Sequence, residues 1–422
     1  MRKLAGIAAM VALCTPGTSP VAAGDYAAAR AELVAAYQVQ DYAAMAAAAE
    51  RALAARPGYP GARFNLALAQ ALHGDAAAAL HSVRALAAAG IDFRVDEMAE
   101  FESLRELPGW DDYRNDIARW REPMGSAAIA VQLDRGDFVP EGIALDADGN
   151  VYLGSIRHGL VVRAGDEPDA LSQRQGHWSV FGMRFARDGS LWFASAAVPQ
   201  LAAVGEDLGK TGLFRLDVDT GEITRAAILP QRAEQQVLGD LVIAGEQIYT
   251  TDSLGGALYR YDIRADEFVT VLEPGTLGSP QGLVLDESGE HLYVADYTGG
   301  LYRVRLADGQ RAAVRVKGEM SAHGIDGLYR TGSTLIAIQN GIRPHRVVSM
   351  RLADDGLTVS AMEVLAANLP EFDEPTLGAI RGDRFYFVAN SHWNRFDAEG
   401  GLPEGLSGPI VLELALPGHP AR

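Results

Sequence analysis

From about residue 127 onward, one unit occurs six times along the chain, and this repeat restricts the fold more than any other feature. Each copy has a short apolar strand, a turn rich in Gly, Asp or Asn, and usually a second strand containing Tyr, Phe or Trp. The six pairs are Gly142-Ile143-Ala144 with Val151-Tyr152-Leu153, Met183-Arg184-Phe185 with Leu191-Trp192-Phe193, Leu241-Val242-Ile243 with Ile248-Tyr249-Thr250, Gly282-Leu283-Val284 with Leu292-Tyr293-Val294, Gly327-Leu328-Tyr329 with Leu335-Ile336-Ala337, and Gly378-Ala379-Ile380 with Phe385-Tyr386-Phe387.

The copies follow one another at 41, 58, 41, 45 and 51 residues, which is the period of four-stranded propeller blades. The sequence therefore predicts a mainly β fold, a six-bladed β-propeller over residues 127–418. A β-sandwich is the alternative, but it does not explain a recurring unit of this length. Residues 410–416 are expected to form the third strand of blade six. Residues 128–133 are expected to add its outer strand, closing the ring and removing open sheet edges.

Residues 24–122 have a different composition, rich in Ala and almost free of β-branched runs. Apolar residues recur at helical spacing, which predicts helices over 41–57, 62–72 and 76–88 and a capping helix over 104–120. The pattern resembles a pair of tetratricopeptide repeats, in which small Ala side chains let helices approach closely. Two repeats are fewer than such arrays usually need. This small all-α helical-repeat domain is therefore expected to lean on a neighbouring domain.

The first 23 residues resemble an export signal. Arg2 and Lys3 form a positive segment, an apolar run follows, and Val21-Ala22-Ala23 offers small residues for a signal peptidase. Periplasmic or secreted localisation is the expectation, with an uncleaved anchor as the alternative. Cleavage after Ala23 would also remove Cys14, the only cysteine, so the mature chain would have no thiol chemistry. No later segment is long and apolar enough to predict a membrane span.

The chain is acidic, with 37 basic and 55 acidic residues and a formal charge of −18. A field of this sign repels nucleic acid and anionic lipid, so neither is an expected partner. It is compatible with cation binding, although a solvated acidic surface explains it equally simply.

In a propeller, the residues just before each inner strand converge on the central channel. These positions hold Glu141, Gly182, Asp240, Gln281, Asp326 and the turn Glu374-Pro375-Thr376. Several acidic groups around one axis repel one another unless a cation lies among them. Oxygen ligands suit a hard ion, so we predict a divalent-metal site with Ca²⁺ as first candidate and Mg²⁺, Mn²⁺ or Zn²⁺ as alternatives. In the other interpretation, each carboxylate caps the backbone of its own turn.

Four short motifs carry a family resemblance: Pro140-Glu141-Gly142, Gly239-Asp240-Leu241, Pro280-Gln281-Gly282 and Ile325-Asp326-Gly327. They resemble the channel motifs of the senescence marker protein/gluconolactonase family, whose architecture paraoxonases and strictosidine synthase-like proteins share. The resemblance spans residues 130–415. It implies a divalent metal held by Glu141, Gln281 and Asp326, with Asp240 beside the substrate and available as a further ligand. Gly239 and Gln281 stand where the family has Asn, which weakens the implied lactonase activity more than the fold.

If the channel is catalytic, the expected reaction is metal-assisted hydrolysis of a small lactone or ester. Asp326 is the candidate general base, because a carboxylate facing the ion can take a proton from water. His323, three residues earlier, is a second catalytic candidate. Asp240, His392 and Trp393 are candidates for substrate binding. Each histidine taken singly also fits an ordinary residue of a surface loop.

The sequence contains no HExxH zinc motif, no Gly-rich phosphate loop and no G-x-S-x-G nucleophile motif. Two functions remain open. The first is a metal-dependent lactonase or esterase acting in the channel. The second is a non-catalytic propeller that binds a ligand or protein, with the helical domain docking a protein partner.

Overall fold

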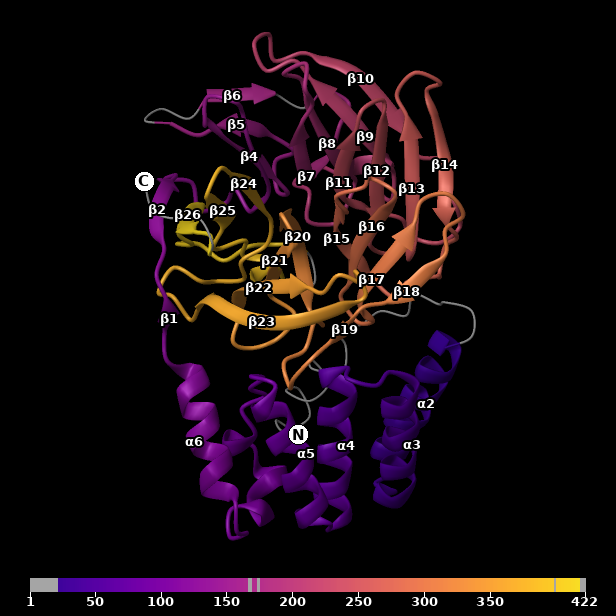
Figure 1. Cartoon of the computed structure of the whole chain (residues 1–422), viewed down its shortest axis with the longest axis vertical. Coiled ribbons are helices and arrows are strands. Elements are labelled where there is room, and N and C mark those ends of the chain that lie inside the picture. The colour runs from indigo at the N-terminus through magenta and orange to yellow at the C-terminus, as the bar shows by residue number, and fades with distance from the viewer. Residues whose placement is uncertain (1–21, 166–168, 173–174, 398–399, 418–422) are drawn as a thin grey trace.

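The computed structural model describes residues 22–165, 169–172, 175–397 and 400–417 (Figure 1). Its larger part is a six-bladed β-propeller, and its smaller, N-terminal part is helical. The predicted fold class is thereby confirmed. The predicted export signal lies outside the described residues except for Ala22 and Ala23, with which the first described helix begins.

Each blade is an antiparallel sheet of four strands with its first strand nearest the axis. Blade one comprises β3 (Pro140–Leu145), β4 (Val151–Ser155), β5 (Val161–Arg163) and β6 (Asp169–Ser172). Blade two comprises β7 (Ser179–Phe185), β8 (Leu191–Ala196), β9 (Thr211–Leu216) and β10 (Ile223–Ile228). Blade three comprises β11 (Leu238–Ala244), β12 (Gln247–Asp252), β13 (Ala257–Asp262) and β14 (Glu267–Leu272). Blades four to six comprise β15 (Pro280–Leu285), β16 (His291–Asp296), β17 (Gly300–Arg305) and β18 (Arg311–Ala313); β20 (Ile325–Thr331), β21 (Thr334–Gln339), β22 (Arg346–Leu352) and β23 (Thr358–Ala367); and β24 (Gly378–Arg381), β25 (Arg384–Val388) and β26 (Ile410–Ala415).

The fourth strand of blade six is β2 (Ala128–Gln132), which precedes blade one in the sequence and pairs with β26. The two ends of the propeller thus share one sheet, as the sequence predicted, and the ring is closed. Blade five carries two additions at its outer edge: β1 (Met124–Gly125) pairs antiparallel with β23, and β19 (Arg315–Val316) pairs with it in parallel.

The helical part contains α2 (Ala22–Gln38), α3 (Tyr42–Ala55), α4 (Pro60–His73), α5 (Ala76–Ala88), the 3₁₀ turns η1 (Val95–Glu97) and η2 (Ala99–Leu104), and α6 (Trp110–Arg121). Asp41 and Asp75 cap α3 and α5 by accepting backbone N–H bonds. The prediction of one helix over 104–120 is corrected: Gly109 has φ +93°, which is not helical, and α6 begins only at the next residue. Within the described residues, no helix is long and apolar enough to cross a bilayer.

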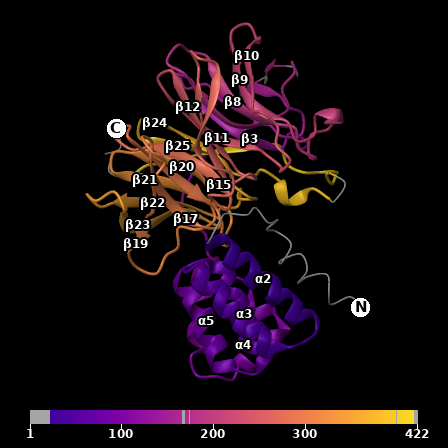
Figure 2. The ribbon, with the colours of Figure 1, turned by 90° about the vertical axis from the view of Figure 1, so that its right-hand side faces the viewer.

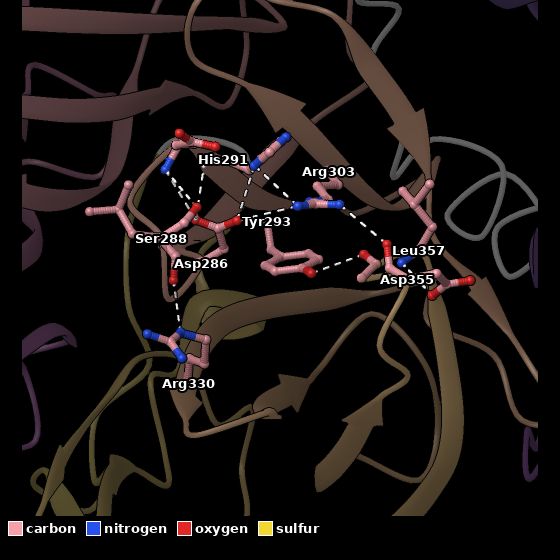
Figure 3. Close-up of polar contacts among 11 residues, drawn as sticks. Asp286, Ser288, His291, Tyr293, Arg303, Arg330, Asp355 and Leu357 are labelled. Atoms are coloured by element: carbon pink, nitrogen blue, oxygen red, sulfur yellow. Dashed lines mark hydrogen bonds and ion pairs between the residues drawn. The ribbon is translucent and has the colours of Figure 1, made fainter.

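Polar contacts fasten neighbouring blades, as Figure 3 shows for blades four and five. The Tyr293 hydroxyl donates to the Gly356 carbonyl at 2.9 Å, and Arg330 Nε donates to the Leu285 carbonyl at 2.9 Å. Both bonds join a side chain of one blade to a backbone carbonyl of its neighbour and so fasten the two sheets together.

The helical part lies against one side of the propeller, next to blade five (Figures 1 and 2). Asn368 Nδ2 donates to the Trp120 carbonyl at 2.6 Å, and the rings of Tyr59 and His323 lie 5.8 Å apart. Both propeller residues belong to loops on the face where the inner strands begin. The helical domain is therefore located beside the mouth of the channel.

Ring closure makes a prediction about Gly408, which lies where the last blade meets the chain after β2. A Cβ at this residue would lie 1.8 Å from the carbonyl oxygen of Leu133. We expect Gly408→Ala to destabilise the fold by about 1–3 kcal/mol through this overlap, measured by thermal or chemical unfolding. Gly165→Ala is the control, because nothing lies within 4 Å of its Cβ position. Equal stability of the two variants would contradict the observed closure.

Candidate functional site

β-bulges present the channel residues to the axis. In the first strand pair of blades one to five, the register shifts between Pro140 and Ile143, Val180 and Met183, Leu238 and Leu241, Pro280 and Leu283, and Ile325 and Leu328. A bulge leaves its residues outside the ladder and can redirect a side chain. Glu141, Asp240, Gln281 and Asp326 all lie in these shifted segments.

The glycines beside these residues are required by close approach of the inner strands. A Cβ on Gly142 would lie 2.0 Å from the Phe181 carbonyl oxygen, and one on Gly282 would lie 2.4 Å from the Leu328 nitrogen. The recurring motif of a polar residue followed by Gly thus has a steric origin. It lets neighbouring inner strands come close enough for their polar side chains to share one space.

These side chains line a cavity of about 420 Å³, a volume suited to a small molecule. Its polar lining includes Glu141, Asp240, Gln281, Tyr297, Asp326, Asn340 and Glu374. Its apolar lining includes Phe181, Val198, Val237, Leu254, Leu377 and Trp393. The residues of the first set come from the starts of inner strands and from loops between second and third strands. The two kinds of loop therefore meet at one face, as propeller geometry predicts.

Two carboxylates in the cavity have specific hydrogen-bond donors. Trp393 Nε1 donates to Glu141 Oε2 at 2.6 Å, and Asn340 Nδ2 donates to Asp326 Oδ2 at 2.7 Å. The Tyr297 hydroxyl in turn donates to Asn340 Oδ1 at 3.0 Å, which fixes the orientation of that amide. Each carboxylate is thus held through one oxygen.

Burial raises the pKa of both acids. Glu141 is 7% exposed, and its desolvation together with the charge of Asp326 holds its pKa well above the ordinary value. Desolvation also raises the pKa of Asp326 to about 7; the charges of Glu374 and Asp240 add to this, whereas the Asn340 hydrogen bond opposes it. The pKa of Glu374 is raised chiefly by its own desolvation. The cavity therefore holds carboxyl groups whose pKa values are raised by burial, and the pKa of Asp326 lies near neutrality.

Asp240 has a different environment from the other acids. Its Oδ2 accepts from Arg184 Nη2 at 3.1 Å, and its Oδ1 accepts from the Leu241 backbone N–H at 2.8 Å. The Arg184 guanidinium also lies over the Tyr329 ring, 5.3 Å from its centroid. Desolvation raises the pKa of Asp240 and the charge of Arg184 opposes this rise. Asp240 is thus compensated by a cation that belongs to the protein itself.

The predicted metal ligands do not all fit a metal equally well. Asp240 uses both oxygens within the protein, so its side chain is the poorest candidate. Glu141 and Asp326 each keep one oxygen without a hydrogen bond in the described part of the chain, and Gln281 uses only its amide nitrogen, toward Ser279. Among the described residues, no three His, Asp or Glu side chains form a group that could hold a metal ion. A hard cation would thus depend on two carboxylates, an amide and water, a set compatible with Mg²⁺ or Ca²⁺.

The two predicted histidines lie outside the cavity lining. His323 packs against Tyr59 of the helical domain, and burial lowers its pKa to about 4, which leaves it neutral. His392 is buried, with Nε2 3.0 Å from the Ser407 carbonyl and Nδ1 3.3 Å from Asp373. The structure thus places His323 at the domain junction and His392 in the loop that presents Trp393. Trp393 itself lines the cavity as predicted.

Sequence reasoning placed Glu374 at the channel without assigning it a role, and it did not select Asn340, Tyr297 or Arg184. For Arg184, a signal existed: it follows the apolar Met183 at a position where blades one, three and four have Ala144, Val242 and Val284. Blade five has Tyr329 there, the ring over which Arg184 lies. Asn340 directly follows β21 and has no sequence signal of its own, because its role depends on Asp326 and Tyr297 being brought to it by the fold.

The raised pKa of Asp326 predicts a pH-dependent stability. Folding raises this pKa from 3.8 to about 7, so the folded chain binds the proton more tightly than the unfolded chain. Ionisation therefore lowers stability progressively as pH rises from about 4 to about 7. We expect the difference in melting temperature between Asp326→Asn and wild type to grow over this pH range and to level off above it. Both proteins are measured in buffer with a chelator. Asp148→Asn, at an exposed position, is the control; a constant difference for Asp326→Asn would contradict the prediction.

The Arg184–Asp240 pair predicts a large stability effect. Asp240 is 2% exposed, so Arg184→Met would leave a buried charge without its partner. We expect a loss of about 3–5 kcal/mol at neutral pH in chemical unfolding. Adding Asp240→Asn should recover part of this loss. Arg187→Met is the matched control at an exposed position. A loss no larger than that of the control would show that the pair does not compensate the channel charge.

Comparisons with known proteins found the following. A family model described as strictosidine synthase-like, N-terminal, matches residues 126–163. No curated protein matches the chain. Among solved structures, the PQQ-bound aldose sugar dehydrogenase from Streptomyces coelicolor is similar, with 15% identity, 69% of this chain and 99% of that chain covered, and a TM-score of 0.47. A catalytically inactive virginiamycin B lyase from Staphylococcus aureus, with quinupristin, has 13% identity, 70% and 100% coverage, and a TM-score of 0.46.

Proposed function

We propose that this protein is an enzyme that hydrolyses a small lactone or ester in the propeller channel with the help of a divalent metal. The observation that carries the proposal is Asp326, whose pKa of about 7 places a buried carboxyl near neutrality beside the raised-pKa carboxyl of Glu141. Both line a cavity of small-molecule size. A group that titrates near the working pH is the most effective general acid or base.

Asp326 is assigned as general base. The Asn340 amide holds its Oδ2, so Oδ1 remains available to take a proton from a water molecule near the substrate. Glu141, whose Oε2 is held by Trp393, would accept or return a proton from blade one. The proposed role of Trp393 is therefore twofold, because it also contributes an aromatic wall against which a ligand can pack.

The cavity lining restricts the substrate. Phe181, Val198 and Leu377 make part of the wall apolar, and four carboxylates contribute negative charge. Anionic molecules such as phosphates are therefore disfavoured, and a neutral lactone or ester is compatible.

A divalent cation, with Ca²⁺ or Mg²⁺ as first candidates, would supply polarisation of the substrate carbonyl and a lower pKa for bound water. Glu141 and Gln281 would hold it directly, and Asp326 would hold it through a water molecule, from which its Oδ1 can take a proton. Asp240 is assigned instead to packing against Arg184 beneath the substrate. The sequence motifs of a gluconolactonase-like family and of an export signal support hydrolysis and a periplasmic or secreted location as parts of the same proposal.

The test is hydrolysis by the full chain. We expect wild type to turn over a member of a panel of γ-lactones, δ-lactones and aryl esters after addition of one of Ca²⁺, Mg²⁺, Mn²⁺ or Zn²⁺. Asp326→Asn and Glu141→Gln should each lower kcat/KM by about 10²-fold or more, because they remove proton transfer while keeping shape. Asp148→Asn, at an exposed position, should leave turnover unchanged.

Absence of turnover with every metal, together with no thermal shift on adding any of them, would overturn the proposal. The channel acids would then be structural. A propeller that binds a ligand or protein without catalysis would become the better description.

A further inference from the structure

The helical domain is packed onto the loop that leads out of the candidate site. This loop joins β21 to β22 and begins with Asn340, the residue that donates to Asp326. Two residues later, Ile342 is 5% exposed and belongs to the hydrophobic core of the helical domain. It is the only propeller residue in that core among the described residues. One short segment thus joins the centre of the channel to the centre of the helical domain.

Backbone and charged contacts hold the same loop. The Asp92 backbone N–H, between α5 and η1, donates to the Arg343 carbonyl at 2.7 Å. The carboxylate of Asp92 accepts from Arg121 Nε at 2.6 Å, which ties this connection to α6. The loop is therefore bound to the connection between α5 and η1, and that connection is itself held by α6.

Contacts with the helical domain also hold the start of β22. Arg346 is fully buried; its Nη1 donates to the Gly90 carbonyl at 3.0 Å and its guanidinium lies over the Trp120 ring. Its Nε donates to Gln339 Oε1 at 2.7 Å, so the same side chain reaches back to the residue preceding Asn340. A Cβ at Gly90 would lie 2.6 Å from Arg346, which shows how closely the two domains fit here.

From these contacts we infer that the helical domain is a positioning element of the channel site, acting through Ile342 and the β21–β22 loop to hold Asn340 in line with Asp326. The consequence for catalysis rests on the proposed function, whereas the coupling itself does not. Ile342 is a positioning residue, because it does not line the cavity. The competing explanation is that the propeller alone fixes Asn340, through the Tyr297 hydroxyl and the Gly341–Gly324 backbone bond.

The test uses the full chain labelled with [¹⁵N]asparagine. The side-chain amide signal of Asn340 is assigned by its loss in Asn340→Gln, and its proton exchange reports the bond to Asp326. We expect Ile342→Ala to shift or broaden this signal and to speed its exchange about tenfold or more, and Ile342→Val to do so less. Ile336→Ala is the matched control, since Ile336 is equally buried on β21 but packs toward blade six.

The outcomes are distinct. An unchanged Asn340 signal in Ile342→Ala, with exchange within twofold of wild type, would overturn the inference and show that the propeller alone positions Asn340. Equal effects of Ile336→Ala and Ile342→Ala would also overturn it, because general loosening of blade five would explain both. If turnover is found, the factor by which Ile342→Ala lowers kcat should be about ten times the factor by which it changes KM. If no turnover is found, the asparagine signal still decides the coupling.

Discussion

Around the propeller axis, carboxyl groups from blades one, five and six line one cavity. Their closeness is a consequence of packing: the glycines after Glu141, Gln281 and Asp326 let the inner strands approach, and the bulges present the preceding side chains to the axis. Desolvation then penalises each charge and the charges penalise one another. The chemistry available to the channel follows from this geometry.

The acidic side chains of the channel differ in the groups that compensate their negative charge. Asp240 has Arg184, a cation fixed within the channel, and therefore contributes to stability in its charged form. Asp326 and Glu141 have neutral donors, Asn340 and Trp393, which orient a carboxylate without neutralising it. A proton or a bound cation must supply the missing positive charge at neutral pH. This difference separates a packing role from a chemical role among side chains that look alike in the sequence.

The propeller could be predicted because its signals are local and repeated. Strand pairs recur at a blade-like period, and the segments that close blade six, 128–133 and 410–416, were identifiable from the same pattern. The convergence of Glu141, Asp240, Gln281 and Asp326 followed from blade equivalence. The partners of these residues could not be predicted, because they come together only in the folded chain: Arg184 and Tyr297 reach across blades, and Asn340 meets Asp326 across a turn of blade five. The contact of His323 could not be predicted either, because Tyr59 comes from another domain.

The position of the helical domain connects its own packing with the candidate site in the channel. Two helical repeats with Ala-rich faces form a small core, and that core takes in Ile342 from the propeller. Burial of Ile342 stabilises the helical domain and at the same time removes freedom from the segment carrying Asn340. A loop that left the channel into solvent would have to be ordered by the propeller alone. A domain fused upstream of the propeller can therefore affect the channel without reaching it, since it orders the loop that begins at Asn340, the hydrogen-bond donor of Asp326.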